Sequence, residues 1–188
     1  MLFRSITPSH TVLDAAKSMI GKKTRLLVFD DDKLVGIITA SDMMRGFRKT
    51  TLTPSISDVI SSNIVKCKYS DTVHYVVKIL HEKRVGSVII DEMEGYGIFT
   101  ERDLLVYVLA NNADMDGPVG GYSSSPLIVA DHKIKGNGAA SIMATHNIKR
   151  LGITKEGKLV GVVTARDVVD AYQSAFQISN PWSEKVGG

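Results

Sequence analysis

The sequence has little of what marks secreted, membrane-bound or strongly charged proteins. Cys67 is the only cysteine among 188 residues, which excludes an internal disulfide and suits a reducing compartment. No apolar run approaches the length of a membrane span, and the first ten residues lack the apolar core of a secretory signal. Hydrophobic residues make up 44% and charged residues 23%, with a formal net charge of only +3. We therefore expect a globular cytoplasmic protein with no membrane partner.

Residue patterns for catalysis and metal binding are also scarce. His74 and His81 lie seven residues apart on one expected helix, too far for the i, i+4 spacing of helical metal ligands. The glycine-rich stretch 117–121 is not followed by the Lys-Ser/Thr of a Walker loop. Cys67 fits a small buried hydrophobe better than a nucleophile. We expect no metal site, no required cofactor and no enzymatic activity.

What the sequence does contain is one motif, Gly-apolar-apolar-Thr-x-x-Asp, which occurs three times and which we call the phrase. The copies read GIITASD at 36–42, GIFTERD at 97–103 and GVVTARD at 161–167. Their first glycines are 97 − 36 = 61 and 161 − 97 = 64 residues apart, and a period of this kind indicates a structural repeat.

The residues before and after each phrase predict the same elements in each repeat. Apolar residues at helical spacing precede the first two copies, at Val12, Ala15, Ala16, Met19 and Ile20 and at Val73, Val76, Val77 and Leu80. In the third copy we expect the helix to begin near Ala139, because Gly136 and Gly138 each cost about 1 kcal/mol in a helix interior. A hairpin and a closing helix complete each unit. The fold class is mixed α+β, with repeats at 1–50, 56–112 and 118–176 and a tail at 177–188 that contains Trp182.

Two linkers join the three repeats. The first, 50–56, is short, and residues 57–62 after it could form a lead-in helix. The second, 111–126, is long and rich in Gly, Ser and Pro, so we expect it to be loose. Repeats one and two should then pack most closely against each other, while the third repeat moves relative to them or packs against a repeat of another chain.

The phrase has two physical interpretations. As a folding device, the threonine hydroxyl would cap the following helix and the acid would complete a capping box, contributing about 1 kcal/mol in each repeat. As a ligand-binding motif, the helix N-terminus and the threonine would bind phosphate, and the aspartate would accept hydrogen bonds from the hydroxyls of a ribose. Arg102 and Arg166 could add phosphate contacts, whereas the first repeat has Ser41 at that position. The residues alone leave both interpretations open.

Repeats of about sixty residues, each closed by this phrase, resemble cystathionine β-synthase (CBS) domains from about residue 3 to residue 175. The resemblance implies β-α-β-β-α units packed side by side through their sheets, whose clefts bind AMP, ADP, ATP, S-adenosylmethionine or NAD(H). CBS domains usually occur in even numbers, so three of them imply a homo-oligomer, such as a dimer, or a longer parent.

The resemblance also assigns site residues. It implies that the Thr and Asp of the phrase bind phosphate and ribose, at Thr39 with Asp42, Thr100 with Asp103, and Thr164 with Asp167. For the adenine pocket it implies the first strand and the start of the next strand, namely Ile6 (within 5–7) with Arg25, Ile64, Val65 and Lys66 with Gly86 and Ser87, and Ile128 (within 127–129) with Arg150.

We therefore expect a regulatory sensor of adenine nucleotides or related adenosyl compounds, involved in energy sensing and acting on a protein partner. One alternative is a structural or oligomerisation module with empty clefts. Another is a nucleic-acid binder that uses the basic clusters Lys22, Lys23 and Arg25, and Arg45, Arg48 and Lys49, although a solvated surface explains those clusters equally well and nucleic acid is the less expected partner.

Overall fold

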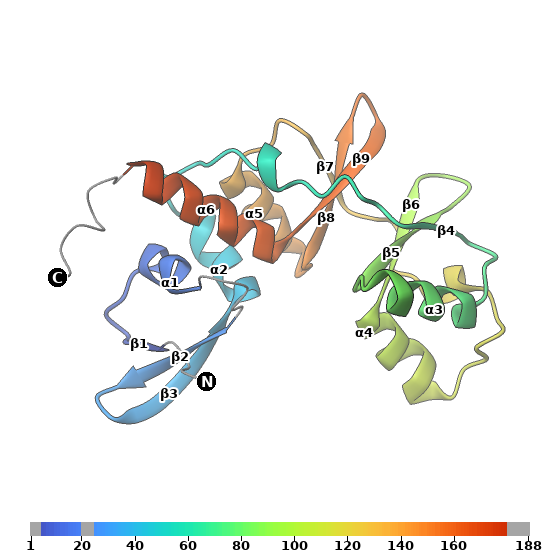
Figure 1. The fold of residues 1–188 in the computed structure, drawn as a ribbon, viewed down its shortest axis with the longest axis horizontal. Coiled ribbons are helices and arrows are strands. Elements are labelled where there is room, and N and C mark those ends of the chain that lie inside the picture. The colour runs from blue at the N-terminus through green and yellow to red at the C-terminus, as the bar shows by residue number, and fades with distance from the viewer. Residues whose placement is uncertain (1–4, 20–24, 180–188) are drawn as a thin grey trace. The chain divides into compact units, whose positions relative to one another are not determined.

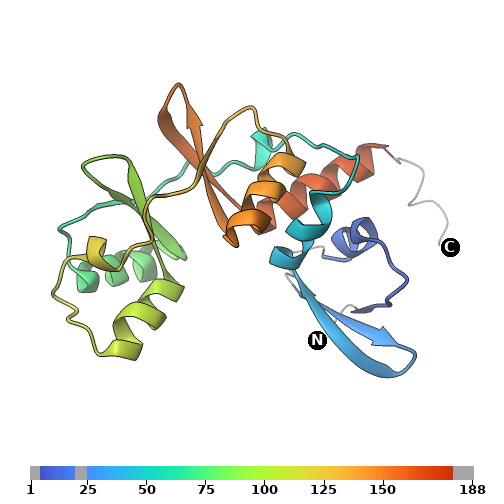
Figure 2. The same cartoon turned by 180° about the vertical axis from the view of Figure 1, so that it is seen from behind.

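The computed structural model of the chain describes residues 5–19 and 25–179 (Figures 1 and 2). These residues divide into two compact units. Unit 1 contains the first and third repeats, up to Ser61 and from Ala130 onward, and unit 2 spans Ser62–Val129. The expectations that concern Ile20, Lys22, Lys23 and Trp182 lie outside the described residues.

Each repeat forms a small three-stranded sheet with two helical segments, which confirms the predicted mixed α+β fold of β-α-β-β-α units. The sheet orders are β1-β2-β3, β4-β5-β6 and β7-β8-β9, and in each hairpin the second strand is antiparallel to the third. The elements of the first repeat are β1 (Ser5–Ile6), α1 (Val12–Ser18), β2 (Arg25–Asp30), β3 (Lys33–Thr39) and α2 (Ala40–Phe47).

The second and third repeats follow the same order with different helices. The second contains a short 3-10 turn η1 (Ser57–Val59), where the lead-in helix was expected, and then β4 (Lys66–Lys68), α3 (Val73–Lys83), β5 (Ser87–Asp91), β6 (Tyr96–Thr100) and α4 (Glu101–Asp103). Beyond α4 its closing helix continues as a π-helix η2 (Leu104–Val108) and a 3-10 helix η3 (Leu109–Asn111). The third contains β7 (Val129–Asp131), α5 (Gly136–His146), β8 (Arg150–Lys155), β9 (Lys158–Thr164) and α6 (Ala165–Ser179).

Helix α5 begins at Gly136, so the prediction of a start near Ala139 was wrong. The Gly136 N–H donates to the Pro54 carbonyl at 2.9 Å. A Cβ at this position would lie 2.9 Å from Pro54 Cγ and 3.2 Å from Tyr172 Cε2. The close approach that only glycine permits therefore outweighs its local cost in helix propensity.

Unit 1 is held together by the helices of the first and third repeats. Helices α1 and α2 pack against α5 and α6, as both views of the ribbon show (Figures 1 and 2). The rings of Phe47 and Tyr172 stack with centroids 3.7 Å apart, and the Tyr172 hydroxyl donates to the Phe47 carbonyl at 3.3 Å. The first repeat thus has the third as its packing partner in unit 1, where we had expected the second. Helices make this contact, although the resemblance implied contact through sheets.

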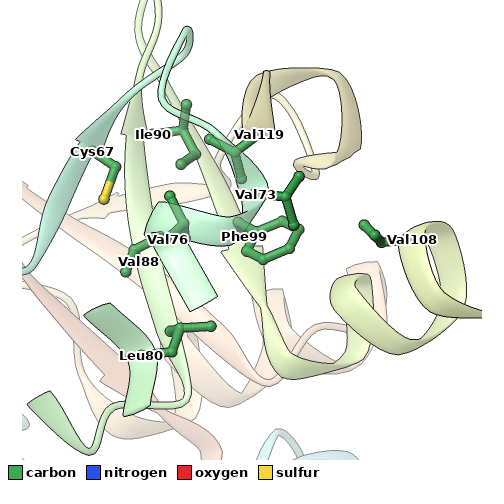
Figure 3. Close-up of a cluster of buried hydrophobic side chains, with 9 residues drawn as sticks. All are labelled: Cys67, Val73, Val76, Leu80, Val88, Ile90, Phe99, Val108 and Val119. Atoms are coloured by element: carbon green, nitrogen blue, oxygen red, sulfur yellow. The ribbon is translucent and has the colours of Figure 1, made fainter. Parts of the chain in front are cut away.

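Unit 2 has its own core around Phe99, which is fully buried (Figure 3). Val73 and Val76 from α3, Val108 from η2 and Val119 from the turn η4 (Val119–Tyr122) surround it. The expectation that 111–126 is loose was wrong, because Val119 anchors this linker in the core. The linker also donates two backbone hydrogen bonds to the β4–α3 turn, from Val119 to Asp71 at 2.8 Å and from Gly120 to Tyr69 at 3.1 Å.

Candidate functional site

The three phrases form three equivalent capping boxes where a strand passes into a helix. In each, the aspartate Oδ2 accepts hydrogen bonds from the backbone N–H and the hydroxyl of the threonine, and the threonine hydroxyl accepts from the aspartate N–H. The two bonds to Oδ2 are 2.8 and 2.6 Å for Thr39–Asp42, 2.8 and 2.7 Å for Thr100–Asp103, and 2.7 and 2.7 Å for Thr164–Asp167. The folding interpretation of the phrase is therefore confirmed.

The same box also occurs where no phrase exists. Thr11 and Asp14 cap α1, with the two bonds to Asp14 Oδ2 at 3.1 and 2.6 Å. The hydroxyl bond from Thr11 is the largest cause that holds the pKa of Asp14 below its ordinary 3.8. A Thr-x-x-Asp cap is thus a general device of this chain, and Thr11 with Asp14 provides an internal control for the capping role alone.

The three phrase aspartates differ in the oxygen that lies outside the cap. Asp42 Oδ1 accepts a hydrogen bond from the guanidinium of Arg45, one turn later in α2. Burial alone would raise the pKa of Asp42, but the hydrogen bonds from Thr39 and the charge of Arg45 outweigh it and lower the pKa below 3.8. The residues equivalent to Arg45 are Val106 and Asp170, so the other two repeats lack this internal cation.

Asp103 is the most enclosed of these carboxylates, with only 5% of its surface exposed. Its Oδ1 lies 3.4 Å from the hydroxyl of Ser124 in the second linker. Ser124 also lines a depression of about 550 Å³ in unit 2, together with Tyr107, Tyr122 and neighbouring linker residues. The linker therefore brings a polar side chain and a hollow surface next to the second phrase.

The glycine that opens the phrase permits the close passage of a lead-in segment. Backbone bridges join Ser61 to Val162 in β9 and Ser124 to Ile98 in β6. A Cβ on Gly161 would collide with Ile60 and lie 2.9 Å from the Ser61 carbonyl, and one on Gly97 would lie 3.0 Å from the Ser123 hydroxyl. Gly161 thus leaves room for residues 60–61, which lead into the second repeat. Gly97 leaves room for residues 123–124, which lead into the third repeat.

Among residues 5–19 and 25–179, no such segment passes close to the glycine of the first phrase. The nearest described atoms to a Cβ on Gly36 belong to Val28, at 3.9 Å, and Leu34, Val35 and Ile37 beside it are 54, 50 and 55% exposed. The first phrase thus forms the same cap as the others, but no described residue covers Gly36 as closely as the lead-in segments cover Gly97 and Gly161.

The structure brings together the start of the second strand and the threonine of the phrase in every repeat. The register pairs Arg25 with Thr39, Ser87 with Thr100, and Arg150 with Thr164. The Gly86 carbonyl accepts the Glu101 N–H at 3.3 Å, which keeps Gly86 at the beginning of α4. These predicted residues therefore lie at one end of each sheet, beside the helix N-terminus.

The residues predicted from the first strands are placed less uniformly. Ile6 is buried and pairs with Val28, and the Val65 carbonyl accepts the Ile89 N–H at 2.9 Å. Ile64 and Ile128 are partly buried just before β4 and β7. At these first-strand residues, a ligand could contact peptide groups and small apolar surfaces.

Lys66 is directed away from the second phrase. Its ammonium lies 3.2 Å from Asp91 Oδ1 and 4.6 Å from the centre of the Tyr96 ring. Asp91 and Tyr96 face each other at the hairpin end of β5 and β6, four residues from the pair Ser87–Thr100, or about 13 Å along the strands. The expectation that Lys66 shares a site with Thr100 therefore does not extend to its side chain.

The two arginines of the phrase also differ from each other. Arg102 is exposed at the start of α4. Arg166 is held by Asp170, with its Nε 3.0 Å from Asp170 Oδ1. A phosphate contact from Arg166 therefore competes with an ion pair within α6.

Sequence reasoning missed Arg45, Ser124 and Asp170. Arg45 and Asp170 lie three residues after the phrase aspartates, so helical spacing could have identified both. No local signal identifies Ser124, which reaches Asp103 only through the fold of the linker.

Within residues 5–19 and 25–179, no three His, Cys, Asp or Glu side chains are grouped so that they could hold a metal ion. No helix in these ranges is both long and apolar enough to cross a membrane. Cys67 is buried, and burial, followed by the charges of Asp71 and Asp91, raises the pKa of its thiol to about 11.

Comparison with known proteins gives one family. The model of the CBS domain matches residues 3–49, 56–110 and 119–174. An uncharacterized protein of Methanopyrus kandleri is 29% identical over 119 residues, which are 61% of each chain. The chain spans 42–66% of the lengths of this and three other curated relatives.

Solved structures show the same fold. An uncharacterized conserved protein from Pyrococcus horikoshii superposes with a TM-score of 0.72 at 24% identity, covering 90% of this chain and 79% of that one. A hexameric CBS-CP12 protein from bloom-forming cyanobacteria superposes with a TM-score of 0.60 at 22% identity, covering 72% and 80% of the two chains.

Proposed function

The chain belongs to the CBS domain family, and from this premise we propose that it is a regulatory protein without catalysis of its own. Its phrase sites bind an adenosine-containing ligand, such as AMP, ADP, ATP or S-adenosylmethionine. A protein partner reads the occupancy of these sites. Proteins of this fold assemble into oligomers, as the hexameric CBS-CP12 protein does, and the chain acts as a homo-oligomer.

The observation that carries this proposal is that only one of the two carboxylate oxygens of each phrase aspartate takes part in the cap. In all three phrases both threonine bonds end on Oδ2. Oδ1 therefore lies outside the cap and can accept a ribose hydroxyl without loss of the helix start. Capping and ligand binding do not compete for the same atom, so one residue can serve both roles.

The second and third sites are the stronger candidates. In the first repeat Arg45 already bonds Asp42 Oδ1, and a ribose would have to displace a charge-assisted hydrogen bond. At the second site the competing group is the neutral hydroxyl of Ser124 at 3.4 Å, which is a weaker interaction. The second site also adjoins the depression that Ser124 lines.

The mechanism follows from differential binding. A ligand that contacts both a phrase and the lead-in segment bridged to the same strand stabilises the arrangement in which the phrase and the segment lie together. It shifts the conformational equilibrium by the difference between its affinities for the two states. A partner that recognises one arrangement would then respond to the concentration of the ligand.

A thermal-shift panel of AMP, ADP, ATP, S-adenosylmethionine and NADH tests this proposal. A ligand at 100 times its dissociation constant adds about 2.7 kcal/mol to the free energy of unfolding, which corresponds to several degrees for a chain of this size. We expect at least one compound to raise the melting temperature, whereas a flat response to all five would refute adenosyl binding.

A further inference from the structure

Strand β3 is the edge strand of the first repeat's sheet, and no segment in the described part of the chain pairs with its outer edge. The edge strands of the other two repeats each accept an extended segment at the residue that follows the phrase glycine. Ser61 and Val162 in β9 exchange two backbone hydrogen bonds of 3.0 Å, and Ser124 and Ile98 in β6 exchange two of 2.9 Å. The equivalent residue of β3 is Ile37, and no described residue bridges it.

The peptide groups of Ile37 face outward at this edge. Ile37, Val162 and Ile98 each lie opposite the third residue of the strand that precedes them, so the three repeats share one register. Because inward and outward peptide groups alternate along an antiparallel strand, the Ile37 N–H and carbonyl point away from β2, as those of Val162 and Ile98 point toward their bridged segments. Outward peptide groups beside an exposed apolar side chain are a template for an added strand.

The β-bulge in this hairpin does not prevent such pairing. A bulge is one device that blunts an edge strand, and the register of β2 and β3 shifts between Val28 and Phe29. The register of β8 and β9 shifts in the same way between Ile153 and Thr154, and β9 nevertheless accepts Ser61. The outer edge of β3 around Ile37 is therefore able to accept a segment as well.

Gly36 is a second sign that a segment approaches this edge. Its φ is not positive, and a Cβ on it would meet Val28 at an ordinary contact distance of 3.9 Å, so neither its backbone nor its described neighbours require glycine. Glycine inside a strand weakens the strand and often marks the close approach of another backbone. At Gly161 that approach is made by the Ser61 carbonyl, 2.9 Å from the position of a Cβ. Gly36 keeps the same room beside β3.

The two ends of this sheet carry opposite charges. Residues 30–32 are three exposed aspartates at the β2–β3 turn, and Lys33 leaves the turn with a net negative charge. Arg25 is exposed at the other end, where it pairs with Thr39. A segment antiparallel to β3 begins beside Thr39 and ends beside the turn. Charge complementarity therefore fits a segment that is acidic toward its N-terminus and basic toward its C-terminus.

We infer that the outer edge of β3 is a docking site for a protein partner, which adds an extended segment to the sheet as an antiparallel fourth strand. The segment places a small polar residue opposite Ile37, with acidic side chains before it and basic side chains after it. The two described segments of this kind, at 60–61 and 123–124, are already bridged to β9 and β6, so the occupant comes from another protein. This inference is independent of the proposed nucleotide sites, and its test needs no nucleotide.

The test measures the binding of a labelled synthetic peptide to the full chain by fluorescence anisotropy. The peptide Asp-Val-Ile-Ser-Ser-Asn-Lys-Lys copies residues 58–63, which contain the segment on β9, and adds two lysines. The control peptide Lys-Lys-Val-Ile-Ser-Ser-Asn-Asp has the same composition with its charged ends exchanged. The wild type should bind the first peptide saturably and at least about tenfold more tightly than the second.

Two variants locate the binding at the β3 edge. Gly36→Val should weaken peptide binding at least about tenfold because it fills the approach, yet leave urea denaturation unchanged because the described fold has room for valine and strands favour it. Ile37→Pro removes the outward N–H at an edge where proline is tolerated, and it should weaken binding to a similar degree. Met93→Val, at a fully exposed residue of unit 2, is the control and should bind as the wild type does.

Several results would overturn the inference. A wild type that binds neither peptide, or both equally, would remove the partner of this chemistry. Undiminished binding by Gly36→Val and Ile37→Pro would move the peptide elsewhere, including an exchange for residues 60–61 on β9, because Gly161 is intact in both variants. A wild-type dimer in analytical ultracentrifugation that Gly36→Val dissociates would place a second copy of the chain on the edge in place of the partner.

Discussion

Replacing Asp103 by alanine separates the folding role of the phrase from its ligand role. The substitution removes the Oδ2 atom that accepts the Thr100 N–H at 2.8 Å and the Thr100 hydroxyl at 2.7 Å. The Asp103 N–H keeps its own bond to the Thr100 hydroxyl at 3.3 Å, so half of the capping box remains. A lost cap costs about 1 kcal/mol, and a buried donor left without its partner adds about 1–3 kcal/mol. We therefore expect Asp103→Ala to lower the free energy of unfolding of unit 2 by about 2–4 kcal/mol.

Asp14→Ala is the matched control, because Asp14 forms the same box at Thr11 outside any phrase. It should cost about 1 kcal/mol, since Asp14 is less buried than Asp103. Urea denaturation followed by circular dichroism measures both losses, and the nucleotide-induced thermal shift is then measured on both variants. The Asp14 variant should keep the full shift and the Asp103 variant should lose part of it. Equal shifts in the two variants would refute the reasoning and leave the phrase as a cap alone.

Three further predictions concern the packing and titration of the chain. Tyr172→Ala should destabilise unit 1 by about 3–5 kcal/mol in urea denaturation, because it removes a buried ring stacked on Phe47, whereas Tyr172→Phe should cost only about 1 kcal/mol. Iodoacetamide at pH 8 should alkylate Cys67 at least about a hundredfold more slowly in the native chain than in urea, because a pKa of about 11 leaves little thiolate. Unit 1 should lose stability as the pH falls from about 5 through the lowered folded pKa of Asp42, because the Asp42 charge stabilises the fold only above that value. Asp42→Asn should flatten this acid limb of the stability curve, and an unchanged limb would show that Asp42 contributes little.

The local elements were predictable because their signals are local. The threonines of the phrase begin helices where the Thr-x-x-Asp pattern indicates, and the apolar spacing of Val12, Ala15 and Ala16 gives the buried face of α1. Strand β2 was equally readable, since its residues 26–29 form one continuous apolar run.

The packing partner of each repeat was not predictable in the same way. All three repeats have similar helices, so periodicity does not show which one faces which. The decisive contacts, such as Phe47 on Tyr172, join residues 125 positions apart. The order of the second linker depends on Val119 entering the core of unit 2, and a Gly- and Ser-rich composition conceals one such anchor.

The ligand site was predictable in part for a related reason. The cap fixes the positions of Thr100 and Asp103, and the sheet register then brings Ser87 to Thr100. The side chains that make the three phrases unequal depend on tertiary contacts instead, as with Ser124 at Asp103. Likewise the Lys66 ammonium pairs with Asp91 at the far end of the sheet, and the sequence position of Lys66 alone does not predict this contact.

Isothermal titration of the nucleotide that gives the largest thermal shift is the most direct test of the proposed function. The comparison is between the wild type and the double variant Asp103→Asn with Asp167→Asn, because asparagine preserves an oxygen acceptor for the cap but removes the charge. Losing hydrogen bonds to a charged acceptor should weaken binding at least about tenfold at each site. The account predicts saturable binding to the wild type and this weakening in a folded double variant. Undiminished binding by the double variant, or none by the wild type, would contradict it.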